Sequence, residues 1–165
     1  MRLIPYIIPI LLLMFAVPVH ADLMVEFIAE SSLPYEYSPN NIDNSSNNID
    51  NSIGNIDNAS GNIYNSEGNL DNSPFNLDNG ASGNKRLLLR KDGQLYRVGY
   101  YVKAENGVIN FFSTKGARLF YNTGKGPGIF HGKKGFFCGV LAIVEGELKM
   151  LLTEKGKQAL MLTKT

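Results

Sequence analysis

Two side chains in the C-terminal half of the chain are of the types that nucleophilic catalysis uses. His131 and Cys138 lie on either side of a Lys134-Gly135 dipeptide. If the chain turns back at this dipeptide, the imidazole lies opposite the thiol, and an adjacent imidazole activates a cysteine nucleophile. The neighbouring Lys133 and Lys134 would also lower the pKa of the thiol. A small Cys/His-dependent enzyme is therefore one hypothesis for this protein.

The rest of the sequence offers this pair no catalytic partners. The same positions in the other predicted hairpins hold side chains suited to packing, namely the pairs Leu89–Tyr96, Phe112–Leu119 and Leu152–Ala159. The sequence contains no phosphate-binding loop, zinc-ligand spacing, paired-carboxylate motif or nucleophile elbow. We therefore assign no catalytic, cofactor-binding or metal-ligating residue, and we favour a protein that is not an enzyme.

Charged side chains are divided unequally along the chain. Residues 22–84 contain ten acidic residues and no Lys or Arg, whereas residues 85–165 contain 15 basic and five acidic residues. The two parts thus carry net charges of about −10 and about +10. A basic domain of this kind fits an acidic envelope polymer as a partner. We also expect the acidic segment to be attracted to the basic domain and to mask it from such polymers.

The first 21 residues have the order of a secretory signal peptide. Arg2 precedes an apolar run over residues 3–17, and the small-residue exit at residues 19–21 fits signal-peptidase cleavage after Ala21. A retained membrane anchor is the alternative, but a spanning helix needs about 20 apolar residues. We expect a secreted or periplasmic protein with no transmembrane span after cleavage, for which export disfavours nucleic acid as a partner. The predicted product has one cysteine, Cys138, so it must fold without an internal disulfide.

A tract that repeats every seven residues begins at Asn41. Each unit starts with Asn, continues with Ile or Leu, and has a second Asn at its fourth position. The six units start at Asn41, Asn48, Asn55, Asn62, Asn69 and Asn76. A coiled coil is excluded because it needs two apolar positions per heptad and good helix formers.

Three interpretations of the tract remain. We favour a disordered spacer over residues 41–84, because one apolar residue per unit cannot offset the cost of ordering the backbone. The second interpretation is a repetitive array with Ile and Leu pointing inward and Asn side chains capping turns. The third is a calcium-dependent adhesive repeat, which the regular Asp spacing suggests.

Units such as Asn69-Leu70-Asp71-Asn72-Ser73-Pro74-Phe75 resemble the repeats of a group of exported bacterial proteins. Those repeats have the form Asn-x-Asp-Asn-Ser-Pro, often with an aromatic second residue, and the proteins are uncharacterised. The resemblance covers residues 41–79. It implies export and a bacterial source, and it implies no activity.

Residues 85–165 predict an all-β domain. Four dipeptides ending in Gly lie between short apolar runs, which is typical of tight hairpins: Asp92-Gly93, Lys115-Gly116, Lys134-Gly135 and Lys155-Gly156. They predict a small antiparallel meander of eight short strands, at about 86–91, 94–105, 108–114, 117–123, 128–133, 136–144, 147–154 and 157–163. Closure as a barrel would remove exposed edges. A helix over residues 148–162 is the competing interpretation, which Gly156 disfavours.

The expected organisation is a signal peptide (1–21), a lead-in segment (22–40), the repeat tract (41–84) and the β-hairpin domain (85–165). Apolar residues at 23–28 alternate well enough to predict one short strand that docks elsewhere. We expect a non-enzymatic envelope or extracellular protein, a structural or binding module with a basic β domain and an acidic spacer arm. The Cys/His-dependent enzyme and the calcium-dependent adhesive repeat are the alternatives.

Overall fold

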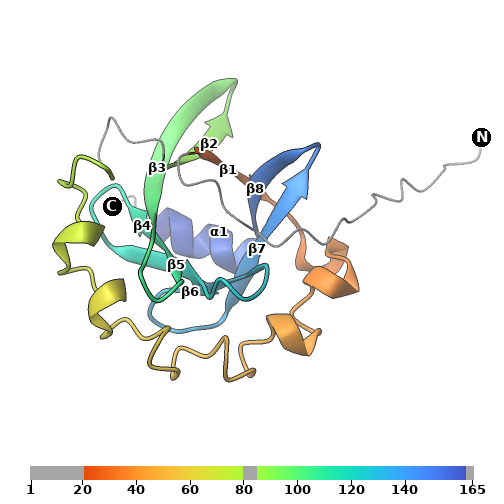
Figure 1. Cartoon of the computed structure of the whole chain (residues 1–165). Coiled ribbons are helices and arrows are strands. Elements are labelled where there is room, and N and C mark those ends of the chain that lie inside the picture. Colours follow the sequence, from red (N-terminus) through yellow and green to blue (C-terminus); the bar gives the residue numbers. More distant parts are fainter. Residues whose placement is uncertain (1–20, 80–84, 163–165) are drawn as a thin grey trace, which may run out of the picture.

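The computed structural model describes residues 21–79 and 85–162. Residues 1–20 of the predicted signal peptide and residues 80–84 of the predicted tract lie outside the described residues. Eight strands close into one barrel (Figure 1), which confirms the all-β prediction. They are β1 (Leu23–Phe27), β2 (Arg86–Lys91), β3 (Gln94–Lys103), β4 (Ile109–Ser113), β5 (Arg118–Asn122), β6 (Gly128–His131), β7 (Phe137–Val144) and β8 (Glu147–Leu152).

The barrel is mixed because β1 comes from the lead-in segment. Strands β2 to β8 form the predicted antiparallel meander, and β1 lies between β2 and β8, parallel to both. Leu23 pairs with Leu87, and Val25 pairs with Leu89 on one side and Met150 on the other. A meander alone would leave β2 and β8 as open edges, and β1 pairs with both of them. The expectation that the lead-in supplies a docking strand is therefore confirmed.

The predicted strand at 157–163 is wrong, because residues Glu154–Met161 form a helix, α1. Gly156 has a normal helical conformation and packs against the carbonyl of Cys138, where a Cβ atom would overlap that oxygen. Glycine is thus required here for a close approach between helix and strand, rather than for a turn. Ala159 and Leu160 are buried in the barrel core, so the predicted Leu152–Ala159 strand pair does not form.

Two apolar layers are built on the barrel. The inner core contains side chains from all eight strands and from α1, including Phe111, Phe120 and Met150. A second cluster, on the outer face, joins Tyr121, Phe130, Phe137 and Val140 to Leu33 of the lead-in segment. Every residue of β4 and β5 is buried, so both faces of these strands are covered. The segment that covers their outer face is the repeat tract.

The repeat tract is ordered, so the prediction of a disordered spacer is wrong over residues 41–79. The tract curves around one side of the barrel as a ribbon of consecutive turns (Figure 1), interrupted by single-turn 3₁₀ helices. The short 3₁₀ helices of the chain are Glu30–Ser32, Tyr35–Tyr37, Ile42–Asn44, Ile63–Asn65 and Leu70–Asn72. Within the described residues, no helix has the length and apolar character of a membrane span.

Candidate functional site

Each repeat unit contains one or two turns that are supported by a side chain. The Asn at the first position accepts a hydrogen bond from the backbone N–H two residues later, as in the 2.9 Å contact from Asp71 N to Asn69 Oδ1. Where the fifth residue is Ser, its hydroxyl does the same, as in the 3.2 Å contact from Phe75 N to Ser73 Oγ. Asn and Ser favour such local hydrogen bonds over regular helix or strand. The unit therefore follows directly from its residue types.

The Asn at the fourth position links successive units. The Asn58 amide nitrogen donates to the carbonyl oxygens of Asp50 at 2.7 Å and Ser52 at 3.0 Å, both in the preceding unit. The six fourth-position residues make this pair of contacts and are almost fully buried: Asn44, Asn51, Asn58, Asn65, Asn72 and Asn79. Buried turn carbonyls need donors, and these amides provide them. This ladder of amides orders the tract without an apolar core of its own.

The same Asn residues dock the tract on the barrel. The backbone carbonyl of Asn51 accepts from the Tyr121 hydroxyl at 2.7 Å, and that of Asn72 accepts from the Tyr100 hydroxyl at 2.6 Å. Similar contacts from the barrel are Arg118 Nη1 to Asn58 O at 2.9 Å, Asn110 Nδ2 to Asn65 Oδ1 at 3.0 Å, and Arg97 Nη2 to Asn79 O at 3.0 Å. The fourth-position Asn of five successive units thus contacts β5, β4 and β3 in order, each with one donor from the barrel.

Arg118 lies at the centre of this junction and is only 2 % exposed. Its Nε donates to Asn110 Oδ1 at 2.7 Å, and its Nη1 also donates to the carbonyl of Gly132 at 3.1 Å. Burial lowers the pKa of Arg118 to about 10, which leaves the guanidinium protonated at neutral pH. Glu67 of the tract accepts from the Arg118 backbone N–H at 2.8 Å and pairs with Lys133 at 3.3 Å. The attraction expected between the acidic segment and the basic domain therefore has specific contacts in the structure.

The apolar second residues of the units point away from the barrel. Their exposed fractions lie between 62 % and 83 % for Ile42, Ile49, Ile56, Ile63, Leu70 and Leu77. The array interpretation placed these side chains inward, which is wrong. The barrel presents hydroxyl, guanidinium and amide donors to the tract. The Asn at the fourth position of each unit therefore faces the barrel, and the Ile or Leu at the second position faces solvent. We call these six side chains the apolar row.

His131 and Cys138 do not form the predicted pair. A bulge at Ile129 and Phe130 shifts the register, so Phe130 pairs with Phe137 and Ile129 pairs with Gly139. Cys138 lies in the inner core, and burial raises the pKa of its thiol to about 12. Within the described residues no hydrogen bond joins the two side chains. Cys138 Sγ donates to the carbonyl of Phe136 at 3.6 Å.

The imidazole of His131 has a local role instead. Its Nδ1 accepts from the backbone N–H groups of Lys133 at 3.1 Å and Lys134 at 3.3 Å, which fixes the β6–β7 turn. Burial, followed by the charge of Lys134, lowers the pKa of His131. A neutral imidazole that serves as a turn acceptor and a protonated thiol in the core are not an activated nucleophile and base.

The described residues also contain no group of three Asp, Glu, His or Cys side chains that could hold a metal ion. Five of the six units contain one Asp each, and these Asp residues are solvent-exposed. This arrangement lacks the six or more oxygen ligands that calcium requires around one point. The sequence feature that could have indicated the amide ladder was the Asn at the fourth position of all six units.

Comparison of the chain with protein-family models, with curated proteins and with solved structures finds no match. The arguments on function below therefore start from the geometry of the tract and the barrel.

Proposed function

We propose that this protein is an exported, non-enzymatic binding protein of the envelope or extracellular space, in which the barrel holds the repeat tract as a rigid interaction arm. The observation that carries the proposal is the apolar row, six exposed Ile and Leu side chains spaced one per unit. Exposed apolar side chains that recur at a fixed spacing along one face support an interaction site on that face. Export is supported by the signal-peptide pattern of residues 1–21.

Rigidity makes the apolar row effective for binding. The amide ladder and the barrel donors hold each unit in place before a partner arrives, so little conformational entropy remains to be lost on association. A flexible spacer with the same side chains would lose that entropy at every unit. The ordered tract is therefore better suited to recognition than the disordered arm that its composition suggested.

The charges beside the apolar row define the chemistry of the partner. Residues 22–84 contain no Lys or Arg, and the side chains of Asp43, Asp71 and Asp78 make no ion pair within the described residues. A protein surface with apolar side chains flanked by Lys or Arg complements this arrangement. We assign such a basic, apolar protein surface as the partner of the arm.

The binding test uses an amphipathic peptide of alternating Leu and Lys blocks, with a Leu/Glu counterpart of the same length. Fluorescence anisotropy should show that the protein from Asp22 onward binds the Lys peptide and discriminates against the Glu peptide. Replacement of Ile49, Ile56 and Ile63 by Ser should weaken binding by at least about tenfold, because three contacts of the row are removed. Ile143→Ser is the control, since this exposed residue lies on β7. Equal binding by the wild type and the triple variant would overturn the proposal.

Export is tested separately by sequencing the N-terminus of the protein recovered from its native source. The proposal expects Asp22 as the first residue, because cleavage follows Ala21. Recovery of a chain that begins at Met1 contradicts it.

An acidic envelope polymer is the second candidate partner, favoured by the exposed Arg90 and Lys91 of β2. The tract covers Arg118 and pairs with Lys125 and Lys133, which removes these cations from the free basic surface. A chain that lacks residues 41–79 should therefore bind a polyanion such as heparin more tightly than the wild type at low salt, and salt at about 0.5 M should abolish the difference. Equal affinity at low salt excludes this masking.

A further inference from the structure

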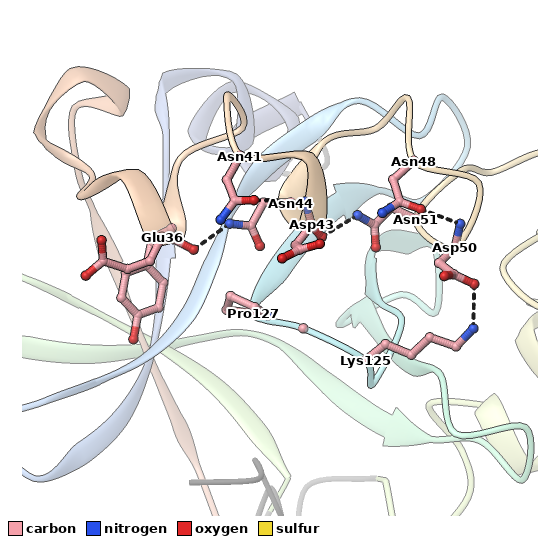
Figure 2. A pocket seen from close by; sticks show the side chains of 11 residues that line it. Glu36, Asn41, Asp43, Asn44, Asn48, Asp50, Asn51, Lys125 and Pro127 are labelled. Carbon is pink, nitrogen blue, oxygen red and sulfur yellow. Dashed lines mark hydrogen bonds and ion pairs between the residues drawn. The ribbon is translucent and has the colours of Figure 1, made fainter. Parts of the chain in front are cut away.

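Two neighbouring pockets lie where the lead-in segment meets the first repeat units, and we call them the polar part and the apolar part. The polar part has a volume of about 350 Å³ and lies between the tract and the loop at Lys125, Gly126 and Pro127 (Figure 2). The apolar part has a volume of about 500 Å³ and lies over the outer face of β7 and β8. Glu36 and Tyr37 line both parts, so the two parts are neighbours.

The polar part contains a buried hydrogen-bond acceptor that has no partner. The Asn44 amide nitrogen donates to the carbonyl of Glu36 at 2.7 Å, as the amide ladder requires. Its Oδ1 is buried and makes no hydrogen bond within the described residues, and in Figure 2 it points toward Pro127 across the polar part. A buried carbonyl oxygen without a donor is costly, and a donor brought by a ligand would remove that cost.

The charges of the polar part favour a cation. Three carboxylates line it, those of Glu36, Asp43 and Asp50, together with one cation, Lys125. Lys125 is already paired with Asp50 at 2.7 Å, which leaves Glu36 and Asp43 without an ion pair in the described structure. The side chains of Glu36 and Asp43 make no internal hydrogen bond either, because their contacts with Asn44 and Asn51 use backbone carbonyls. A ligand with several N–H donors and a positive charge satisfies Asp43 and Asn44 Oδ1. The Glu36 carboxylate points away from Asn44 in Figure 2 and adds its negative charge at the rim.

The apolar part fits a hydrocarbon chain. Its walls include Phe27, Leu33, Val140, Val144 and Leu151. Leu33 and Val140 belong to the outer apolar cluster, so the cavity continues a surface from which water is already excluded. Glu26 at its edge is paired with Lys149 at 2.7 Å and is thus already neutralised.

We propose that these two pockets together bind an aliphatic primary amine. The ammonium group lies against Asn44 Oδ1 and the carboxylate of Asp43, with the charge of Glu36 at the rim, and the alkyl chain passes Tyr37 into the apolar part. An ammonium group has three donors and no acceptor, which matches a polar part that offers acceptors. The alkyl chain gains about fourfold in affinity for each methylene that it buries. This site is separate from the apolar row and does not depend on the function proposed for it.

The test measures binding of n-octylamine to the protein from Asp22 onward by titration calorimetry at about pH 7, where the amine is protonated. We expect n-octanol and octanoate to bind at least about tenfold more weakly, because neither brings a positive charge. Butylamine should also bind more weakly than octylamine, because it buries fewer methylenes.

Variants separate this site from general adsorption. The double change Glu36→Gln and Asp43→Asn should weaken octylamine binding by at least about tenfold and leave octanol binding unchanged. Asp71→Asn is the matched control, because Asp71 occupies the same place in its unit as Asp43 and does not line the cavity. Equal affinity for octylamine and octanoate overturns the proposal, and so does a double variant that binds octylamine as tightly as the Asp71 control.

Discussion

The barrel and the repeat tract are both ordered, but they bury opposite kinds of side chain. The barrel encloses fully buried Phe111, Phe120 and Met150, whereas the tract buries amides such as Asn58 and leaves Ile56 76 % exposed. In the barrel, apolar area removed from water drives order. In the tract, the local turns and the paired amides satisfy the backbone, and the barrel supplies the remaining donors. A segment with few apolar residues can therefore be ordered when another part of the protein donates hydrogen bonds to the carbonyls of its turns.

The difference also shows how the two regions depend on each other. The tract covers the outer face of β4 and β5, and Tyr121 reaches from that face to the carbonyl of Asn51. The barrel closes through β1, which precedes the tract in the chain, and β2, which follows it. The tract is thus the connection between two neighbouring strands, and it is held to the barrel along its length.

Loss of a side chain from the inner core should have the largest effect. Phe120→Ala removes a fully buried ring and should lower the free energy of unfolding by about 3–5 kcal/mol, because a cavity remains among rigid strands. Urea unfolding followed by circular dichroism measures the change. A loss below about 1 kcal/mol would contradict the assignment of Phe120 to the inner core.

Loss of one amide from the ladder should have a smaller effect. Asn58→Ala leaves the carbonyls of Asp50 and Ser52 without their donor, and we expect a cost of about 1–3 kcal/mol. The matched control is Ile56→Ser in the same unit, which should change stability by no more than about 0.5 kcal/mol because the side chain is solvent-exposed. A larger loss of stability for Ile56→Ser than for Asn58→Ala would mean that Ile56, and not Asn58, faces the barrel.

The thiol of Cys138 distinguishes opening of the barrel from opening of the tract. Because it lies in the inner core with its pKa raised to about 12, it should react with a thiol reagent about a thousandfold more slowly than an exposed cysteine at about pH 8. The Asn58→Ala variant should accelerate amide hydrogen exchange over residues 41–79. It should accelerate labelling of the Cys138 thiol by a smaller factor, because the barrel stays closed. Rapid labelling of the native wild type would instead support the Cys/His-dependent enzyme.

The smallest expected effect is a pH dependence at the β6–β7 turn. Burial and Lys134 hold the pKa of His131 below its ordinary value of 6.5, so the unfolded chain takes up the proton at a higher pH than the folded chain. Stability should therefore decrease as the pH falls from about 6.5 toward the folded pKa, and this contribution should level off below it. Urea midpoints measured from about pH 7.5 to about pH 5.5 should show the slope. His131→Asn, which keeps a turn acceptor, should reduce it; an unchanged slope excludes His131 as its source.

Local structure could be predicted well from the sequence. The two-residue turn at Asp92-Gly93 forms as expected, with Lys91 opposite Gln94. Lys115-Gly116 and Lys134-Gly135 lie in longer turns instead, closed by Ser113 with Ala117 and by His131 with Phe136. Gly93, Gly116 and Gly135 have the positive φ angles of 77°, 86° and 72° that favour glycine. The expected strand pair Leu89–Tyr96 is confirmed, whereas the expected pair Phe112–Leu119 is wrong because Phe112 lies opposite Arg118. Turn chemistry and alternation act over a few residues, so they can be read along the chain.

Other features depend on contacts between distant segments. A one-residue bulge moves Phe112 opposite Arg118, and the turn over residues 132–135 places His131 opposite Phe136 rather than Cys138. No local residue pattern specified either feature. Gly156 could not be recognised as a helix residue because its requirement comes from the carbonyl of Cys138 on β7.

The sequence by itself determined that residues 41–79 would form turns, because Asn, Asp, Ser and Gly satisfy their own backbone locally. Whether those turns stay in one arrangement, and which side faces outward, was decided by the tertiary structure. The docking donors lie at least 18 residues away along the chain, as with Arg97 and Asn79, or as far as 70 residues, as with Tyr121 and Asn51. The energy that orders the tract exists only once the barrel has brought those donors together.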